Sequence, residues 1–395
     1  MVDLLGYLWV IWLIGIPIYL RLLFSIIKNR GALVNSDTRC DIHSPFIIFQ
    51  ITTKGGQKIV LDNVNKINEV CSKIGYKNFR IDVISEIIEK FKGANVITIP
   101  KDFTPLHAKF KARALQYAIQ FREKSNENTA SYWIFHLDDE SMLTEQCLIS
   151  LMKHIEGKGN PISEGLIIYP NKWNEGSKLV KYLDSIRPVF CYECMNMLSQ
   201  RSGFPDWLHG SNLLVRADIE KSIGWDFDTI SEDSLFGYKA FKKYGKTIFG
   251  WHGGMLKEQS PFTFKDFVKQ RKRWISGTIM NLRYQTTKEK ALVLYRLSSW
   301  AIGFFSFFVM ILSFLVKQQV IYFLQPLLAF NYILLLAIYQ IGFQMNTSEL
   351  KFSMKKRIME HVIVGILTPL LLFLESIPIW AWIRHHSNEF EIIMK

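Results

Sequence analysis

Long apolar segments occupy the two ends of the chain and leave a polar middle between them. The first segment runs from about Leu4 to Ile27 and is interrupted only by Arg21. Three more segments follow toward the other end, at Leu297–Val316, Val320–Met345 and Ile358–Ile383. As helices rising 1.5 Å per residue, all are long enough to cross a hydrocarbon layer of about 30 Å. The pattern predicts a multi-pass integral membrane protein with about four spans.

Basic residues gather on one side of these predicted spans. Lys28 and Arg30 follow the first span, and a basic cluster at 351–357 lies between the third and the fourth. The loop between the second and third spans holds only Lys317. Because positive charge marks the cytosolic side, the polar middle is expected to be cytosolic, at the cell membrane or at the endoplasmic reticulum of a eukaryote. The first segment lacks a preceding positive charge and a cleavage site, so we expect an anchor rather than a signal peptide.

The polar middle alternates short apolar runs with stretches of helical periodicity. The runs that indicate buried strands are Pro45–Thr53, Phe79–Ser85, Asn95–Pro100 and Tyr132–Asp139. Strand–helix–strand alternation predicts an α/β layered sheet, in which ligands bind beyond the carboxyl ends of the strands. No GxGxxG follows the first strand, and the chain has no P-loop sequence. A dinucleotide oxidoreductase or an NTPase is therefore not expected.

The charge balance narrows the class of partner. A formal net charge of +13 favours an anionic partner such as nucleic acid, anionic lipid or a phosphorylated ligand. With 49% apolar and 14% aromatic residues and with membrane spans beside the basic run, no nucleic-acid partner is expected. Cys191 and Cys194 have the spacing of zinc ligands, but no second pair completes such a site. We expect those thiols to be packed in the interior.

Two acidic motifs are candidates for chemistry. The sequence HLDDES places Asp138, Asp139 and Glu140 at the end of an apolar strand. Neighbouring carboxylates repel one another unless a cation is present, and a divalent ion such as Mg²⁺ or Mn²⁺ would remove that cost. A solvated acidic turn is the alternative. In SEDSLFGYKAF, Glu232 and Asp233 stand at the predicted start of a helix, where a carboxylate can also serve as a helix cap.

The third motif is a basic and aromatic run, FVKQRKRW, at 267–274. Ser260-Pro261 predicts a helix start, and the aromatic residues could form one apolar side of that helix. By itself the run is typical of a helix lying on a membrane surface. In an active site, we expect Gln270, Arg273 and Trp274 to point inward, and Lys269 and Lys272 to meet headgroups or solvent.

Together these motifs resemble the membrane-bound family 2 glycosyltransferases. The resemblance is strongest to the Egghead-type β-mannosyltransferase branch and more distant to cellulose and hyaluronan synthases. The matching stretches are FKARALQYA at 110–118, WIFHLDDES at 133–141, GSNLLVR at 210–216, SEDSLFGYKAF at 231–241 and EQSPFTFKDFVKQRKRW at 258–274. The resemblance implies a GT-A-type (Rossmann-like) domain joined to a helical membrane unit. The implied segments are an N-terminal transmembrane helix at 1–29, a catalytic domain at 30–258, an interfacial region at 259–290 and transmembrane helices at 291–395.

The resemblance also implies an inverting, metal-dependent sugar transfer from a nucleoside diphosphate. Asp233 is the implied general base, and Asp138 and Glu140 the implied ligands of Mn²⁺ or Mg²⁺. The residues implied for the donor are Thr52, Thr53, Glu86, Lys111, Asp138, Asp139, Gln270 and Arg273. Those implied for the acceptor are Trp274, Glu232, Gly210 and Ser211. Glu86 departs from the aspartate that is common in the family at the base-reading position, which leaves the base open.

The substrates follow from the same resemblance. GDP-mannose is the favoured donor, with UDP-glucose as the alternative, and the favoured acceptor is a lipid-linked saccharide or a polyprenyl or dolichyl lipid. The spans hold few polar residues, so a single addition is favoured over processive synthesis. Glu360 and Glu375 lie within the last span and are candidates for a functional role. A non-catalytic membrane scaffold would be expected to lack Asp138, Asp233 or Arg273, and all are present.

Overall fold

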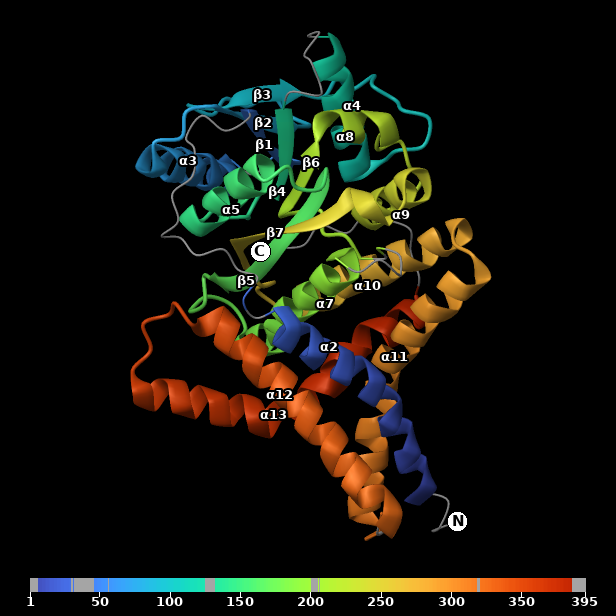
Figure 1. Cartoon of the computed structure of the whole chain (residues 1–395). Coiled ribbons are helices and arrows are strands. Elements are labelled where there is room, and N and C mark those ends of the chain that lie inside the picture. The colour runs from blue at the N-terminus through green and yellow to red at the C-terminus, as the bar shows by residue number, and fades with distance from the viewer. Residues whose placement is uncertain are drawn as a thin grey trace.

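The computed structural model describes residues 6–29, 31, 46–55, 57–124, 132–199, 205, 207–317 and 320–385. Leu4, Arg30 and Pro45, which entered the sequence predictions, lie outside these ranges, and so does Cys40. The described residues form an α/β domain that stands above a group of long helices (Figure 1).

The domain is built on a mixed sheet of seven strands in the order β3-β2-β1-β4-β6-β5-β7. The strands are β1 Phe46–Thr53, β2 Phe79–Ser85, β3 Asn95–Thr98, β4 Tyr132–Asp138, β5 Ile162–Asn171, β6 Leu213–Arg216 and β7 Phe249–Gln259. Strand β6 is antiparallel to both of its neighbours, whereas the other pairs are parallel. The predicted α/β class is confirmed, and so are the four predicted strands.

Strands β5 to β7 were not predicted from the sequence. Strand β6 has only the four residues LLVR, which is too short to stand out as a periodic run. Strand β7 is broken by glycines in FGWHGGMLKEQ, and isolated glycines weaken a strand pattern. Both strands form because they pair with long buried neighbours, an interaction that local sequence does not report.

Helices cover both faces of the sheet, as the side-chain alternation of β1 requires. Ile47, Phe49 and Ile51 pack in one cluster with side chains of α3 and α5, whereas Ile48 packs on the other side with Ala217 at the start of α8. The helices of the domain are α3 Gln57–Ile74, α4 Phe110–Lys124, α5 Glu145–Glu156, α6 Lys178–Leu183, α7 Arg187–Ser199, α8 Ala217–Ile223 and α9 Glu232–Tyr244.

A buried polar network ties β1 and β4 to α4 and α8. Arg122 donates to Glu220 at 2.5 Å, and His136 Nε2 lies 3.1 Å from the same carboxylate. Gln50 accepts from Arg122 at 2.5 Å and contacts His136 Nδ1 at 3.3 Å. Burial favours the neutral acid, but Arg122 and His136 outweigh it and lower the pKa of Glu220 below its ordinary value. The network therefore fixes both strands two residues before their polar ends.

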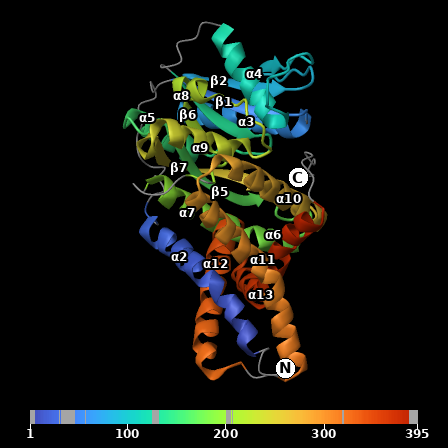
Figure 2. The ribbon, with the colours of Figure 1, turned by 90° about the vertical axis from the view of Figure 1, so that its right-hand side faces the viewer.

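Among the described residues, four helices are long and apolar enough to cross a membrane, in agreement with the predicted segments. The first, Gly6–Asn29, contains the 3₁₀ turn η1 Trp9–Gly15 and α2 Ile16–Asn29. The others are α11 Thr287–Leu315, α12 Gln325–Thr347 with its preceding 3₁₀ turn η5 Tyr322–Leu324, and α13 Met354–Arg384. Figure 2 shows these helices gathered on one side of the domain.

Helix α10, Phe264–Asn281, carries the basic and aromatic run and lies between the domain and the long helices (Figure 2). It contacts α9 and α6 of the domain and α13 of the helical group. The helix begins three residues later than Pro261, because Thr263 is the N-cap and its hydroxyl accepts from the Asp266 amide at 3.1 Å. The predicted start at Ser260-Pro261 was therefore wrong by one turn.

Candidate active site

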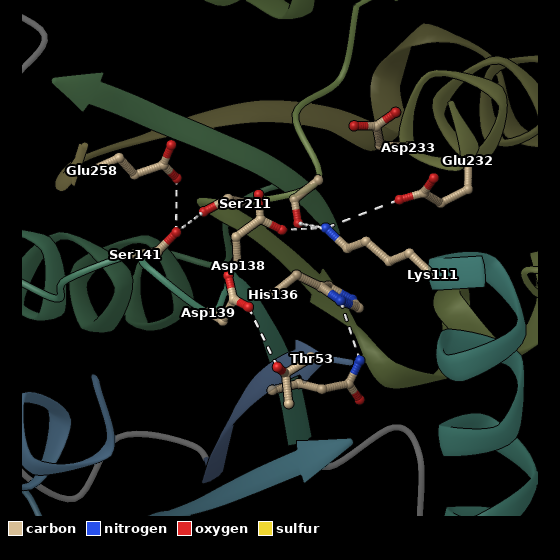
Figure 3. Close-up of polar contacts among 12 residues, drawn as sticks. Thr53, Lys111, His136, Asp138, Asp139, Ser141, Ser211, Glu232, Asp233 and Glu258 are labelled. Atoms are coloured by element: carbon tan, nitrogen blue, oxygen red, sulfur yellow. Dashed lines mark hydrogen bonds and ion pairs between the residues drawn. The ribbon is translucent and has the colours of Figure 1, made fainter. Parts of the chain in front are cut away.

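The polar ends of β1 and β4 meet at the carboxyl edge of the sheet. Thr52 is in register with Asp138 in the parallel pairing of these strands. The Thr53 hydroxyl donates to Asp139 Oδ2 at 3.3 Å (Figure 3). The Asn63 amide of α3 donates to the Asp138 carbonyl at 3.1 Å and so holds the turn that follows β4. The sheet thus brings together donor-site candidates that are more than eighty residues apart in the chain.

Glu86 lies at the same edge, after β2, but its carboxylate faces α4. Its Oε1 atom is 3.7 Å from Nη1 of Arg113, and its side chain remains partly exposed. Arg113 also donates to the Phe103 carbonyl at 2.9 Å. The partial exposure of Glu86 leaves its carboxylate accessible at the rim of the site.

Lys111 is the central cation of the site (Figure 3). Its ammonium donates to Asp138 Oδ1 and to the Gly210 carbonyl, the latter at 3.1 Å. It also lies 4.0 Å from Glu232 Oε1. Burial would lower the pKa of Lys111, but the attraction of Asp138, Glu232 and Asp233 outweighs burial and raises it. Lys111 is therefore a permanently charged group among carboxylates.

The ED pair stands at the first turn of α9, facing Lys111. Asp233 accepts from the Ser234 amide at 2.7 Å and from the Ser231 hydroxyl at 3.2 Å. Burial raises the pKa of Asp233 despite the opposing effect of Lys111. Burial and the neighbouring Asp233 raise the pKa of Glu232 to about 7. The pair therefore binds protons far more readily than exposed carboxylates do, which suits acid–base chemistry.

Hydrogen bonds among Ser141, Ser211 and Glu258 hold the DDES turn in place. Ser141 donates to Glu258 Oε1 at 2.7 Å, and its hydroxyl lies 2.7 Å from that of Ser211 (Figure 3). Ser211 is only 3% exposed, so its hydroxyl is engaged inside the protein. Glu140 is likewise buried, at 4% exposed. Burial raises the pKa of Glu258, which the sequence analysis did not single out although it belongs to the matching stretch EQSPFTF.

The loop that carries Gly210 is fixed from two directions. The His209 amide donates to the buried carboxylate of Glu164 in β5, whose pKa burial raises well above its ordinary value. Burial, assisted by Arg187, lowers the pKa of His209 to about 4, so its imidazole is neutral near pH 7. Asn212 closes the loop with φ of 57° and donates to the Leu166 carbonyl at 2.8 Å. The Gly210 carbonyl is thereby held against Lys111.

The basic run of α10 differs from the expectation in which of its residues are buried. Gln270 and Arg271 are 1% and 2% exposed, whereas Lys269, Lys272 and Arg273 are half-buried. Burial and Asp233 raise the pKa of Glu232, and Arg273 partly opposes that rise by attracting its carboxylate, so Arg273 acts on the ED pair. Of the three residues expected to point inward, Gln270 is buried, whereas Arg273 and Trp274 are half-buried.

Arg271, to which the sequence analysis gave no role, is the guanidinium at the centre of a buried network. Its Nη2 donates to Asp184 at 2.6 Å, and its Nε lies 3.6 Å from Glu375 of α13. It also stacks against Trp274, with its Cζ 4.3 Å from the ring centroid, and Arg187 lies at 5.1 Å. The indole is thus fixed by guanidinium groups. No local signal distinguishes Arg271 from its basic neighbours, because its partners are distant in sequence.

The DDE turn has donor atoms suitable for a hard divalent ion. Carboxylate oxygens are the ligands that Mg²⁺ and Mn²⁺ prefer. The ammonium of Lys111 against Asp138 shows that a positive charge is accommodated there, and the Asp138 side chain remains 35% exposed. Within the described ranges, no group of three or more His, Cys, Asp or Glu side chains is arranged to hold a metal. Asp138 therefore offers a partly exposed carboxylate for such an ion, and further oxygen ligands would come from the neighbouring Glu140, from water and from substrate.

Comparison with known proteins agrees with this geometry. Residues 133–345, more than half of the chain, match the protein-family model described as Glycosyl transferase family group 2. The chain is 30% identical over 269 residues to the beta-1,4-mannosyltransferase egh of Drosophila melanogaster. It is 29% identical over 278 residues to the beta-1,4-mannosyltransferase bre-3 of Caenorhabditis elegans. Each alignment covers 65% of this chain, and the chain spans 58% of the length of each relative.

One solved structure shares the fold. The mannosyltransferase PcManGT from Pyrobaculum calidifontis, solved in complex with GDP-Man and Mn²⁺, is similar over 96% of this chain and 99% of its own. The TM-score is 0.50 and the sequence identity is 10%. At this identity the likeness establishes only the arrangement of the elements.

Gly210 provides a test of the Lys111 site. A Cβ at this position would lie 2.7 Å from Lys111 Nζ and 3.1 Å from Asp233 Oδ2. Gly210→Ala should displace the ammonium and weaken nucleoside-diphosphate binding by about tenfold or more, since a charged hydrogen bond contributes ~1.5–3 kcal/mol. Calorimetric titration measures this. Gly31→Ala, whose methyl meets no atom within 4 Å, is the control. Equal affinity in both variants would contradict the assigned role of Lys111.

Proposed function

The chain belongs to the family 2 glycosyltransferases, and from this premise we propose that it transfers mannose from GDP-mannose to a lipid-linked acceptor, with inversion at the anomeric carbon. The observation that carries the proposal is the cluster of Lys111, Asp138, Glu232 and Asp233 at the carboxyl edge of the sheet. It combines a fixed cation for a diphosphate with an adjacent carboxylate of raised pKa. The similarity to the mannosyltransferases egh and bre-3 supports mannose as the sugar.

The donor half of the site would hold the nucleotide at the ends of β1 and β2. Thr52, Thr53 and Glu86 would contact the base and the ribose. Lys111 would stabilise the diphosphate, because its charge is already held in place and requires no reorganisation. Asp138 and Glu140 would hold Mn²⁺ or Mg²⁺, which when bound neutralises charge on the departing diphosphate. Gln270 and Arg273 of α10 would close the donor site, and Asp139 would hold the turn.

In the transfer step, Asp233 would accept the proton of the acceptor hydroxyl. The hydroxyl oxygen then forms its bond to the anomeric carbon while the bond to the diphosphate oxygen breaks, and that electron pair leaves with GDP. A single displacement of this kind inverts an α-linked donor to a β-linked product. Glu232 and the neighbouring Gly210 would shape the acceptor side. Ser211 would act through the support of the Gly210 loop rather than by touching the sugar, because its hydroxyl is buried against Ser141.

The acceptor would approach from the side on which α10 meets the long helices. Trp274 would offer a face to the acceptor sugar, oriented by Arg271 and Arg187. A lipid-linked acceptor fits because α10 lies directly beside helices able to cross a membrane. We assign residues 30–258 to the catalytic domain and 259–290 to the interfacial segment. The catalytic domain would lie on the cytosolic side, which the distribution of basic residues in the loops favours.

A ligand panel tests the choice of donor. In detergent with Mn²⁺, GDP and GDP-mannose should raise the Tm of the protein, whereas UDP and UDP-glucose should leave it unchanged. Binding at 100 times Kd contributes about 2.7 kcal/mol to stability, which is readily measured as a shift in Tm. Chelation of the metal should reduce the shift. Stabilisation by uridine nucleotides alone would replace GDP-mannose with a uridine donor.

Asp233→Asn tests the base. The variant should lower kcat by a factor of about 10²–10⁴ while GDP-mannose still raises the Tm, because only proton transfer is removed. Asp228→Asn is the matched control, since Asp228 is exposed and pairs with Arg283 at 3.1 Å. Wild-type turnover in Asp233→Asn would refute the assignment, as would a loss of turnover in the control of the same size.

The pH profile provides an independent test. A base must be ionised to act, and the pKa of Asp233 is raised while that of Glu232 is raised to about 7. The value of kcat/KM should therefore fall with decreasing pH at a pH above the ordinary range of a carboxyl group. Glu232→Gln removes one charge from the coupled pair and should move this limb to lower pH. A limb that stays in place in Glu232→Gln would contradict the coupling.

A further inference from the structure

Helix α13 remains in contact with the catalytic side of the protein along most of its length. Near its start, Glu360 is 1% exposed, accepts from the Tyr182 hydroxyl and lies 3.2 Å from Lys178, both residues of α6. Fifteen residues later, Glu375 meets Arg271 of α10 at 3.6 Å. That separation is about 22 Å of helix. A helix perpendicular to the membrane would have left the domain over such a distance.

The other long helices do lead away from the domain. The Trp9 indole in η1 donates to Ser313 near the end of α11 at 2.9 Å. Asn331 near the start of α12 donates to the Trp12 carbonyl at 2.9 Å. These contacts define a far end of the helical group, opposite the domain. Figures 1 and 2 both show α2, α11 and α12 reaching that far end while α13 stays directly beneath the domain.

The second half of α13 packs closely against the middle of α11. The Trp380 indole donates to the Ala301 carbonyl at 3.0 Å. A Cβ at Gly303 would lie 2.6 Å from the Leu372 carbonyl oxygen, so the two backbones nearly touch there. Phe373 of α13 also packs against Phe304, Phe307 and Phe308 of α11, so residues 372–380 of α13 meet residues 301–308 of α11. Pro369 and Pro378 lie inside α13, and a proline in a helix interior permits a bend.

The two faces of α13 differ in chemistry. Glu360 and Glu375 face the domain, where they find cationic or hydroxyl partners. The opposite side of the first half exposes a row of large apolar side chains. These are Met354 at 74%, Ile358 at 58%, Met359 at 51%, Val362 at 54% and Ile366 at 73%. Lys355, Lys356 and Arg357 stand at the N-terminal end of the row, as in helices that lie at a membrane surface.

We propose that α13 does not cross the membrane but lies in its interfacial plane, with the apolar row in the bilayer and the two carboxylates docked on the catalytic domain. Only the helix containing α2, together with α11 and α12, would then cross. Both ends of α13 would lie on the side of the catalytic domain. We assign the bilayer as the partner of the apolar row because the row lies next to the spanning helices and continues their lipid-facing surface. This proposal is independent of the catalytic activity.

Cysteine labelling in sealed vesicles tests the topology. In a Cys40→Ser background, the native cysteines among the described residues are buried. Single reporters would be Lys77→Cys on the domain, Lys317→Cys between α11 and α12, and His385→Cys just after α13. A membrane-impermeant maleimide should modify the His385 and Lys77 reporters from one side and the Lys317 reporter from the other. Modification of the His385 reporter together with the Lys317 reporter would show that α13 crosses, and would overturn the proposal.

Measurements of depth in the bilayer test whether lipid covers the apolar row of α13. Nitroxide labels at Met354→Cys and Ile366→Cys are separated by twelve residues, or about 18 Å along the helix. In liposomes, both labels should be accessible to oxygen and lie at similar shallow depths. A difference in depth approaching 18 Å would indicate a spanning helix. Low oxygen accessibility at both positions would mean that protein covers the row, which would also overturn the proposal.

Discussion

The site depends on one ammonium group that is held among carboxylates. Asp138, Glu232 and Asp233 come from β4 and α9, and their mutual repulsion would oppose burial in one place. Lys111 of α4 offsets that repulsion, and the Gly210 carbonyl fixes its position. The same arrangement leaves Asp233 and Glu232 with raised pKa values. A single cation therefore permits the site to form, while burial outweighs that cation and leaves the carboxyl groups able to exchange protons.

A second buried cation couples this site to the membrane helices. Arg271 joins Asp184 of the domain to Glu375 of α13 and also orients Trp274. Removal of one partner from such a group leaves a buried charge uncompensated, at a cost of about 3–5 kcal/mol. Buried charge pairs therefore fix α10 against the domain through Asp184 and against α13 through Glu375. Any movement of α13 relative to the domain would be transmitted to the indole, because the same guanidinium contacts both.

The strand ends show how much of the site was predictable. Asp138 and Asp139 follow an apolar run, and parallel strands of an α/β sheet present their carboxyl ends together, so Thr53 and Asp139 were expected to be neighbours. Lys111 was implied for the donor and Gly210 for the acceptor, and the two residues are in contact. The strand ends themselves could be located because strand period is a strong local signal.

The neighbours of other site residues could not be predicted from strand period, because tertiary structure determines them. Ser141, Ser211 and Glu258 come from three separate segments, and only the pairing of β4 through β7 brings them together. Arg271 is one basic residue among several, and the three-dimensional positions of Asp184 and Glu375 decide that it is the buried one.

The amino-acid pattern by itself determined the α/β class, the four apolar helices, and the order of the acidic and basic motifs. These features depend on the period of apolar residues and on segment length, which are properties of contiguous chain. Only the tertiary structure decided which carboxylates face Lys111 and which guanidinium is buried. It also decided that α13 lies against the domain, although its hydropathy equals that of the first span, 2.2 in each case. Hydropathy measures transfer out of water, whereas the direction of a helix is set by the partners of its few polar side chains, here Glu360 and Glu375.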